Sequence, residues 1–360
     1  MASRKGLSVL VAEEHETIGE PEKCDGLVSL KGLKELGFLP SSDVIQSRVS
    51  RAVIHSPGGA ELVVDASSAD VVVLDRSAYD RQVAGMARGA GAAVAAGTRV
   101  TGFRDLGDRA RLMVGGKETD SRYYVDATGP ASSPRSGIVL AAKYEVEADW
   151  VREGVVEIFL DAEKYPGFFA WVIPYGKDLA KVGAAGRGIN SRAVLESFLA
   201  RGKHRVIRKV VAPIYIGGPT AAFCEGRRLK VGESAGMVKP TTAGGIVTSL
   251  AGGSVAADWL ARALGGGDQS LLDGYQSEWE SRYGKEMLSM KRLRRLFEQL
   301  SNKQLDSLVG VISAPKIAER LSRSDFDFHA SGLVRALGVR GVVQLAKIGA
   351  TAEAKALLAG

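Results

Sequence analysis

The segment Val231-Gly-Glu-Ser-Ala-Gly-Met-Val-Lys-Pro-Thr-Thr-Ala-Gly-Gly-Ile246 predicts a strand, a turn of small residues and the start of a helix. We expect the strand at 228–231 and the helix to begin near Gly244. Small residues in the turn allow backbone to approach a ligand closely. Gly244 and Gly245 would leave free N–H groups at the helix start, which suits an anion or a polarised carbonyl.

Glu233 stands at the end of the predicted strand. A carboxylate that accepts hydrogen bonds from sugar hydroxyls, followed by an open helix N-terminus, suits the ribityl-phosphate arm of a flavin. A plain strand–turn–helix connection is the alternative, but it does not explain the small residues on both sides of a Pro-Thr-Thr step. The pattern therefore favours a flavin site formed by Gly232, Glu233, Gly236, Gly244, Gly245 and Ile246.

The segment resembles the second FAD-contact motif of the geranylgeranyl reductase family, which belongs to the flavoproteins built like aromatic hydroxylases. That family typically has Gly-Asp-Ala-Ala-Gly, then an Asn-Pro step, then Gly-Gly-Gly-Ile at a helix start. Here Glu233 replaces the Asp, Lys239 the Asn and Ala243 one Gly. Glu233 can still accept hydrogen bonds, but its side chain reaches farther.

A second stretch, Glu14-His-Glu-Thr-Ile-Gly-Glu-Pro-Glu-Lys-Cys-Asp-Gly26, resembles the family's Glu-x-x-x-x-Gly-x-Pro-x-x-Cys-x-Gly motif. The resemblance implies that Cys24 lies beside the flavin ring, near the double bond that is reduced. An isolated alkene needs a proton as well as a hydride, and a thiol is mostly protonated at neutral pH and can deliver one. Cys24 is therefore the predicted catalytic residue and a cofactor contact; a buried cysteine without a chemical role is the alternative.

The chain begins with features of a dinucleotide-binding fold. Residues 6–12 predict a buried parallel strand, and Glu13 and Glu14 follow it. In such folds an acidic residue there holds the adenosine ribose, about 20 residues after a glycine-rich turn. Because no Gly-x-Gly-x-x-Gly follows a strand in this sequence, we expect that turn to precede Met1. Three explanations stay open: a start codon placed too late, which we favour, a segment from another chain, or a decayed protein without cofactor.

Two further stretches resemble cofactor segments of these flavoproteins. Asp75-Arg-Ser-Ala-Tyr-Asp80 is similar to the family's Asp-Arg-x-x-Phe-Asp, which opens a helix, here expected at 79–93. The resemblance implies that Arg76 faces the flavin or its phosphates, whereas Asp80 is interpreted as a helix-start carboxylate. The strand and turn at 123–130 resemble the Asp-Ala-x-Gly segment that packs on the cofactor, through Ala127 and Gly129.

The stretch Phe168-Phe-Ala-Trp-Val-Ile-Pro174 resembles the family's Tyr-x-Trp-x-Phe-Pro motif, which lines the lipid cavity. Phe169, Trp171 and Pro174 match and are the predicted substrate contacts. Alternate residues of a strand share a face. Without the resemblance, an ordinary sheet core would be the preferred interpretation.

Composition limits the partners. The 360 residues are 45% hydrophobic and 25% charged, with a net charge of +7, which favours anionic partners. No nucleic-acid motif is present. The two cysteines and four histidines show no spacing for a metal site or a disulfide scaffold. With no run of 18 apolar residues, we expect a cytoplasmic protein, soluble or peripheral. The basic helix around 291–295 is by default a solvated face, with contact to an anionic membrane or a lipid diphosphate as the alternative.

These patterns predict an α/β protein of the aromatic-hydroxylase type. We expect a discontinuous Rossmann-like FAD domain at 1–136 and 225–268, an antiparallel substrate sheet at 137–224, and a helical region at 269–360. The expected activity is FAD-dependent saturation of geranylgeranyl double bonds, in isoprenoid diphosphates or archaeal-type ether lipids. The electron donor, ferredoxin, NAD(P)H or another, stays open. The alternatives are a flavin monooxygenase and a lipid-binding relic without catalysis.

Overall fold

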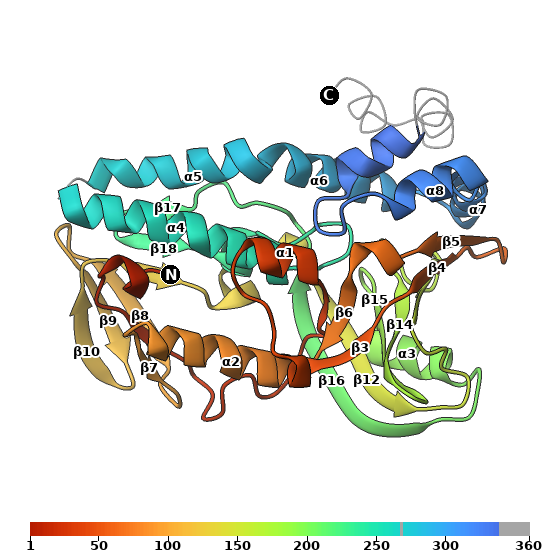
Figure 1. Ribbon diagram of the computed structural model, residues 1–360, viewed down its shortest axis with the longest axis horizontal. Helices are drawn as coiled ribbons and strands as arrows, with labels where there is room; N and C mark the ends of the chain where they lie inside the picture. The colour runs from red at the N-terminus through yellow and green to blue at the C-terminus, as the bar shows by residue number, and fades with distance from the viewer. Residues whose placement is uncertain (267–268, 338–360) are drawn as a thin grey trace.

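A computed structural model describes residues 1–266 and 269–337 of the chain (Figure 1). The structure contains two short pairs of parallel strands. β1 (Leu10–Ala12) pairs with β7 (Ala93–Ala95), and β11 (Tyr124–Asp126) pairs with β18 (Arg228–Lys230). β18 also pairs antiparallel with β17 (Cys224–Glu225). β1 is parallel to its partner, as predicted for residues 6–12, and β11 and β18 lie within the strands predicted at 123–130 and 228–231.

The first strand differs from its prediction in length and burial. Only Leu10–Ala12 forms a strand, and the side chains of Leu10 and Val11 keep 51% and 40% of their surface exposed. Within the described residues β1 has a ladder partner on one edge, β7, and β11 likewise has only β18. The expected burial is therefore wrong for β1, because Leu10 and Val11 line a large cavity.

A fully buried strand leads into the helix predicted after Asp75. β6 (Val71–Leu74) pairs antiparallel with β2 (Leu27–Ser29) and β3 (Ile45–Arg48). The Asp75 side chain then accepts a 2.8 Å hydrogen bond from the Ala78 N–H and caps α2 (Arg76–Gly89). The cap explains why the helix begins earlier than the expected residue 79.

The largest sheet has seven strands in the order β16-β12-β15-β14-β13-β4-β5. Its neighbours are antiparallel except β13 and β4, which are parallel. The strands are β4 (Arg51–His55), β5 (Glu61–Asp65), β12 (Ile138–Glu147), β13 (Val155–Phe159), β14 (Ala170–Gly176), β15 (Leu179–Ala185) and β16 (Arg205–Tyr215). The sheet predicted at 137–224 therefore also contains β4 and β5, a hairpin from earlier in the chain. The helix α3 (Ser191–Leu199) packs on this sheet through Leu195 and Leu199.

The remaining small elements flank this framework. A three-stranded antiparallel sheet contains β8 (Val100–Asp105), β9 (Ala110–Val114) and β10 (Lys117–Ser121). The short helix α1 (Leu30–Glu35) begins directly after β2, where the Ser29 hydroxyl accepts a 3.1 Å hydrogen bond from the Gly32 N–H.

Helices dominate the chain after the glycine turn, as predicted. α4 (Ile246–Gly266) begins just after Gly244 and Gly245 and packs beside α5 (Asp273–Trp279) (Figure 1). A π-helical turn at Glu280–Gly284 leads into α6 (Lys285–Phe297). α7 (Asn302–Ile312) and α8 (Pro315–Ser322) lie against β5. The part of the predicted helical region at 338–360 lies outside the described residues.

Candidate functional site

A single cavity of about 2580 Å³ brings most of the predicted site residues together. Its wall includes the glycine turn before α4, the end of β1, the loop around Cys24, the start of α2 and the aromatic start of β14. The predicted residues that line it are Glu13, Glu14, Cys24, Arg76, Ala127, Gly129, Gly232, Glu233, Gly244, Gly245, Ile246, Phe169 and Trp171. Segments that are far apart in the sequence thus converge on one space.

Gly236 and Pro174 are not part of the cavity lining. Gly236 has φ +72°, and a Cβ there would lie 2.1 Å from the carbonyl oxygen of Gly218, so this position serves close backbone packing. Pro174 is buried in β14, where its carbonyl oxygen accepts a 2.8 Å hydrogen bond from the Ser47 hydroxyl. At both positions the structure shows packing within the protein. A sequence motif does not distinguish such packing from contact with a ligand.

Glu233 turns toward β16. Its Oε1 accepts a 2.7 Å hydrogen bond from the backbone N–H of Tyr215. Burial raises the pKa of Glu233, and the Tyr215 N–H partly opposes that effect. Oε2 lies 3.8 Å from the position of a Cβ on Gly129, where the turn after β11 meets the turn after β18. One carboxyl oxygen is therefore engaged in the protein, and the other faces the meeting point of these two turns.

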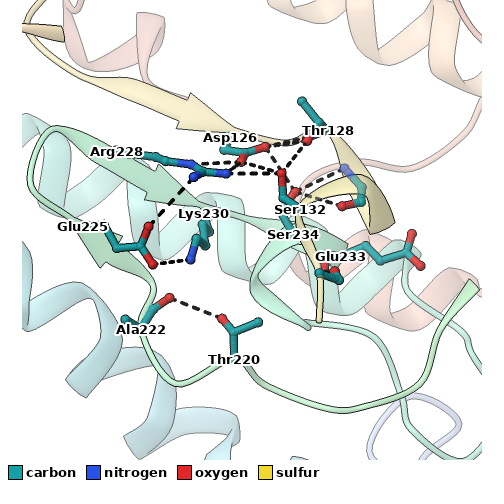
Figure 2. A network of polar contacts seen from close by, with 12 residues as sticks. Asp126, Thr128, Ser132, Thr220, Ala222, Glu225, Arg228, Lys230, Glu233 and Ser234 are labelled. Carbon is teal, nitrogen blue, oxygen red and sulfur yellow. Dashed lines mark hydrogen bonds and ion pairs between the residues drawn. The ribbon is translucent and has the colours of Figure 1, made fainter. Parts of the chain in front are cut away.

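Asp126 ties those two turns together, as Figure 2 shows. Its buried carboxylate accepts hydrogen bonds from the Thr128 hydroxyl (2.7 Å), the Ser132 hydroxyl (2.9 Å) and the Arg228 guanidinium. The Ser234 hydroxyl, which lies 3.3 Å from Asp126, accepts from the Gly129 N–H at 3.1 Å. Burial alone would raise the pKa of Asp126, but these donors hold it below its usual value. Asp126 is the first residue of the Asp-Ala-x-Gly stretch, in which only Ala127 and Gly129 had been predicted to contact the cofactor.

The acidic pair after β1 lies at the cavity wall with local partners. Glu13 Oε1 is 2.6 Å from His15 Nδ1, and Glu14 Oε2 is 3.3 Å from Arg99 Nε. The side chains of Glu13 and Glu14 are 37% and 48% exposed. They are placed where a sugar could reach them.

The Cys24 loop lies between α2 and the large sheet. Its thiol is exposed, and the Gly26 N–H donates to Cys24 Sγ at 3.5 Å. Gly26 has φ +82°, and a Cβ there would lie 2.2 Å from the Leu74 carbonyl oxygen, so only glycine fits. On the other side of the loop, the Ser77 hydroxyl donates to the Gly19 carbonyl oxygen at 2.7 Å.

Two buried lysines of the large sheet hold this loop, and sequence reasoning missed both. Lys143 on β12 donates to the Cys24 carbonyl oxygen at 2.9 Å, and Lys181 on β15 donates to Glu22 Oε1 at 2.8 Å. The lysine side chains are only 3% and 1% exposed. The available signal was a lysine with apolar residues on both sides of it in a predicted strand, because such a charge requires a partner in the core.

An aromatic cluster forms the apolar wall. The Phe168 and Phe169 rings stack at 4.1 Å, and Trp171 meets Phe169 edge to face at 6.0 Å. The indole lies over β15 because residue 183 is glycine: a Cβ there would lie 2.1 Å from Trp171. The predicted aromatic face is therefore both sheet core and cavity wall.

The basic stretch of α6 is not uniformly solvated. Arg294 is 4% exposed; its Nε bonds to Glu298 Oε1 at 2.9 Å, and its guanidinium lies 4.8 Å from the Phe168 ring centre. Burial lowers the pKa of Arg294 to about 10, although Glu298 opposes that effect. The predicted solvated basic face is therefore wrong for Arg294, because its side chain packs against Phe168 and pairs with Glu298.

Lys239, the residue in place of the family's Asn, turns inward as well. Its ammonium donates to the Phe326 carbonyl oxygen at 3.1 Å and lies 3.4 Å from Asp327 Oδ1. Burial lowers the pKa of Lys239, while Asp327 opposes that effect. The segment after α8 therefore closes over the glycine turn before α4.

Comparison with known proteins identifies the family. The chain is 30% identical over 355 residues to digeranylgeranylglycerophospholipid reductase 2 of Methanopyrus kandleri, covering 90% of this chain and 87% of that protein. The chain belongs to the digeranylgeranylglycerophospholipid reductase family. The enzyme of that name from Methanocaldococcus jannaschii is 25% identical, with 85% of each chain covered. It follows that this protein is an oxidoreductase. No protein-family model matches the sequence.

Solved structures agree on the fold. A geranylgeranyl bacteriochlorophyll reductase-like protein from Thermoplasma acidophilum superposes with a TM-score of 0.84 at 21% identity, over 96% of this chain and 94% of the other. A flavoprotein/dehydrogenase from Cytophaga hutchinsonii gives 0.67 at 15% identity, over 100% and 95%. The predicted α/β fold of flavin-dependent enzymes is thus confirmed.

No helix between residues 1 and 266 or 269 and 337 is long and apolar enough to cross a membrane. Within the same residues, no three His, Cys, Asp or Glu side chains are grouped to hold a metal ion.

Proposed function

We propose that this family member is an FAD-dependent reductase that saturates the double bonds of geranylgeranyl chains in isoprenoid diphosphates or archaeal-type ether lipids. One observation carries the proposal: a single cavity joins the glycine turn before α4, the exposed thiol of Cys24 and the aromatic wall of β14. The flavin, the proton donor Cys24 and the isoprenoid chain of the substrate would therefore lie in the same cavity. The names of the relatives, which are reductases of geranylgeranyl lipids, support the same activity.

The cavity wall fits a flavin dinucleotide. Gly232 (φ +64°), Gly244 and Gly245 expose backbone, and the N-terminus of α4 opens into the cavity beside them. Glu233 keeps one carboxyl oxygen directed at the turns around it. We propose that these residues with Ile246, Ala127 and Gly129 hold the flavin end of FAD, and that Glu13 and Glu14 hold its adenosine ribose. When bound and reduced, the flavin would supply a hydride.

The chain's own residues supply the rest of the chemistry. Cys24 presents its thiol to the cavity, where it would protonate the second alkene carbon. Trp171 and Phe169 would pack against the isoprenoid chain and keep water away from the reacting bond. An apolar wall suits a substrate without polar groups near the double bond, because only packing and burial can orient such a chain.

We also propose the division into an FAD domain at 1–136 and 225–268 and a substrate domain at 137–224. The hairpin of β4 and β5 then belongs to the substrate sheet although it lies in the first range. Cys24 and Trp171 come from the two sides of this boundary, so the reaction site lies where the domains meet.

The test is anaerobic. The purified protein is mixed with FAD, its visible spectrum is recorded, and dithionite-reduced protein then receives a geranylgeranyl ether lipid or diphosphate. Reoxidation of the flavin with addition of two hydrogens per bond supports the proposal, and Cys24→Ser should slow it strongly whereas Cys224→Ser should not. Reduced flavin that persists with every isoprenoid, together with NAD(P)H-dependent oxygen consumption on an aromatic compound, would identify a monooxygenase instead. Absence of any flavin binding would favour the remaining alternative, a lipid-binding relic without catalysis.

A further inference from the structure

The segment at 325–329, which follows α8, is fastened to the glycine turn before α4 by a buried ion pair. Lys239 of the turn donates to the Phe326 carbonyl oxygen at 3.1 Å, and its Nζ lies 3.4 Å from Asp327 Oδ1. The side chains of Lys239 and Asp327 are only 4% and 8% exposed. The proposed function gives this contact between two distant parts of the chain no role.

Lys239 is also the residue around which the glycine turn closes. Its backbone N–H donates to the Gly244 carbonyl oxygen at 2.9 Å, and its own carbonyl oxygen accepts from the Ala243 N–H at 2.9 Å. Its side chain lies so close to Gly244 that a Cβ there would be 2.5 Å from Lys239 Cε. The ammonium that reaches the segment at 325–329 therefore leaves the turn directly beside Gly244.

The conformation of the turn depends on such support. Ala243 adopts φ +58°, a left-handed conformation that is uncommon for residues other than glycine. Strained backbone of this kind persists only where the surrounding contacts determine it. The next two N–H groups, of Gly244 and Gly245, donate to no acceptor within residues 1–266 and 269–337. Lys239 is therefore placed to fix the direction of these two free donors.

The segment at 325–329 also forms part of the cavity wall. Phe326 lines the same cavity as the glycine turn, and its ring centre lies 4.3 Å from Lys239 Nζ. Both Phe326 and Ala243 pack against the core cluster that contains Trp171. The segment therefore connects the turn that is proposed to hold the flavin with the aromatic wall that is proposed to hold the isoprenoid.

We propose that Lys239 is a positioning residue for the cofactor: by binding the segment at 325–329, it holds the glycine turn in the conformation that binds the flavin. Cofactor binding and docking of this segment are then coupled, and such coupling is reciprocal. FAD should bind more tightly when the segment is docked, and bound FAD should favour the docked segment by the same factor. The assignment rests on the proposed function, in which the glycine turn binds FAD.

The first measurement is the affinity for FAD, from a flavin fluorescence titration. Lys239→Met removes the ammonium but keeps a side chain of similar length beside Gly244, and it should weaken FAD binding about tenfold. Asp327→Asn should weaken binding less, because Lys239 keeps the Phe326 carbonyl oxygen as an acceptor. Lys239→Arg keeps the charge and should restore most of the affinity. Leu195→Ala is the control: Leu195 is fully buried on α3 and outside the cavity wall, so this variant should lose stability and keep its FAD affinity.

The second measurement is cleavage of the segment at 325–329 by chymotrypsin, which cuts after aromatic residues. Phe326 and Phe328 are the two sites in this segment, and mass spectrometry identifies cleavage there. In the unmodified protein, bound FAD should slow this cleavage by about the same factor that Lys239→Met loses in affinity. In Lys239→Met the segment should be cut faster without FAD, and adding FAD should no longer protect it.

A double variant separates positioning from stability. Lys239→Met combined with Asp327→Asn leaves neither buried charge unpaired, so its urea midpoint should recover in part, while its FAD affinity should stay as low as that of Lys239→Met. If Lys239→Met does not fold, Thr241→Val removes the second contact between the two segments, from Thr241 Oγ1 to His329 Nε2 at 2.8 Å, and should weaken FAD binding in the same way. Affinity that recovers together with stability in the double variant would overturn the proposal.

The FAD titration also keeps this proposal distinct from the proposed function. Tight FAD binding by the unmodified protein, with the same affinity in the folded variants of Lys239 and Thr241, would refute the positioning role and leave the proposed function standing. No FAD binding by the unmodified protein would refute the proposed function, and the positioning role with it.

Discussion

Replacing Lys181 with Met should destabilise the protein by about 2–4 kcal/mol. Lys181 Nζ lies 2.8 Å from Glu22 Oε1, and the two side chains are 1% and 9% exposed. Removing one partner of a buried ion pair costs about 3–5 kcal/mol, because the other charge stays buried. Arg208 Nη2, 3.5 Å from Glu22 Oε2, remains as partial compensation, so the expected loss is about 1 kcal/mol smaller than that range.

The opposite substitution should cost less. In Glu22→Gln, the Lys181 ammonium keeps the carbonyl oxygens of Asp25 at 3.1 Å and Leu74 at 3.4 Å as acceptors. We expect about 1–3 kcal/mol, as for a charged hydrogen bond that is lost. In the double variant neither unpaired charge remains, so its cost should fall short of the sum by about 1–3 kcal/mol.

Urea unfolding followed by tryptophan fluorescence measures all three variants. Lys164→Met is the control: Lys164 lies 3.2 Å from Asp161 but is 71% exposed, and such pairs contribute about 0–1 kcal/mol. Additive single effects, or a Lys181→Met cost no larger than that of the control, would refute the argument that this pair fastens the Cys24 loop to the sheet.

Two further predictions concern Gly183 and His329. Gly183→Ala should cost about 1–3 kcal/mol in urea unfolding and change Trp171 emission, because its Cβ would meet the indole at 2.1 Å; Gly253→Ala, with open space, is the control, and equal effects would contradict the reasoning. Burial lowers the pKa of His329 to about 4 against 6.5 when unfolded, so stability should be full above pH 6.5 and decline by about 3 kcal/mol as pH falls to 4. His329→Gln, which can still bond to Thr241, should flatten that decline in pH-dependent unfolding, and an unchanged slope would exclude His329 as its source.

Local sequence patterns predicted the parts of the site that depend on turn chemistry. Gly26 and Gly232 both adopt positive φ, and at Gly26 the Leu74 carbonyl oxygen also leaves no room for a Cβ. The aromatic alternation before Pro174 likewise predicted one face of a strand. Such features are encoded within a few residues, and the convergence of the motifs in one cavity followed from the family resemblance.

Long-range pairing was beyond those patterns. The hairpin of β4 and β5 joins the substrate sheet through the parallel pairing of β4 with β13, and no local period specifies that partner. Similarly, β1 has the composition of a buried strand, yet burial depends on what lies beside it. The sequence supplied strand types and turns, while the sheet order came only with the three-dimensional arrangement.

The buried lysines show why the site residues found by motif were incomplete. Lys143 and Lys181 lie in apolar strands, where hydrophobic periodicity predicts core, yet they contact carbonyl oxygens and carboxylates of a loop that precedes both by more than a hundred residues. A buried ammonium is costly unless its partners are fixed. The loop and the sheet must therefore dock in one relative position to satisfy both charges. That requirement fixes the position of the Cys24 loop in the cavity that Trp171 also lines. The same ion pairs that cost desolvation in folding therefore define the geometry on which the proposed proton transfer depends.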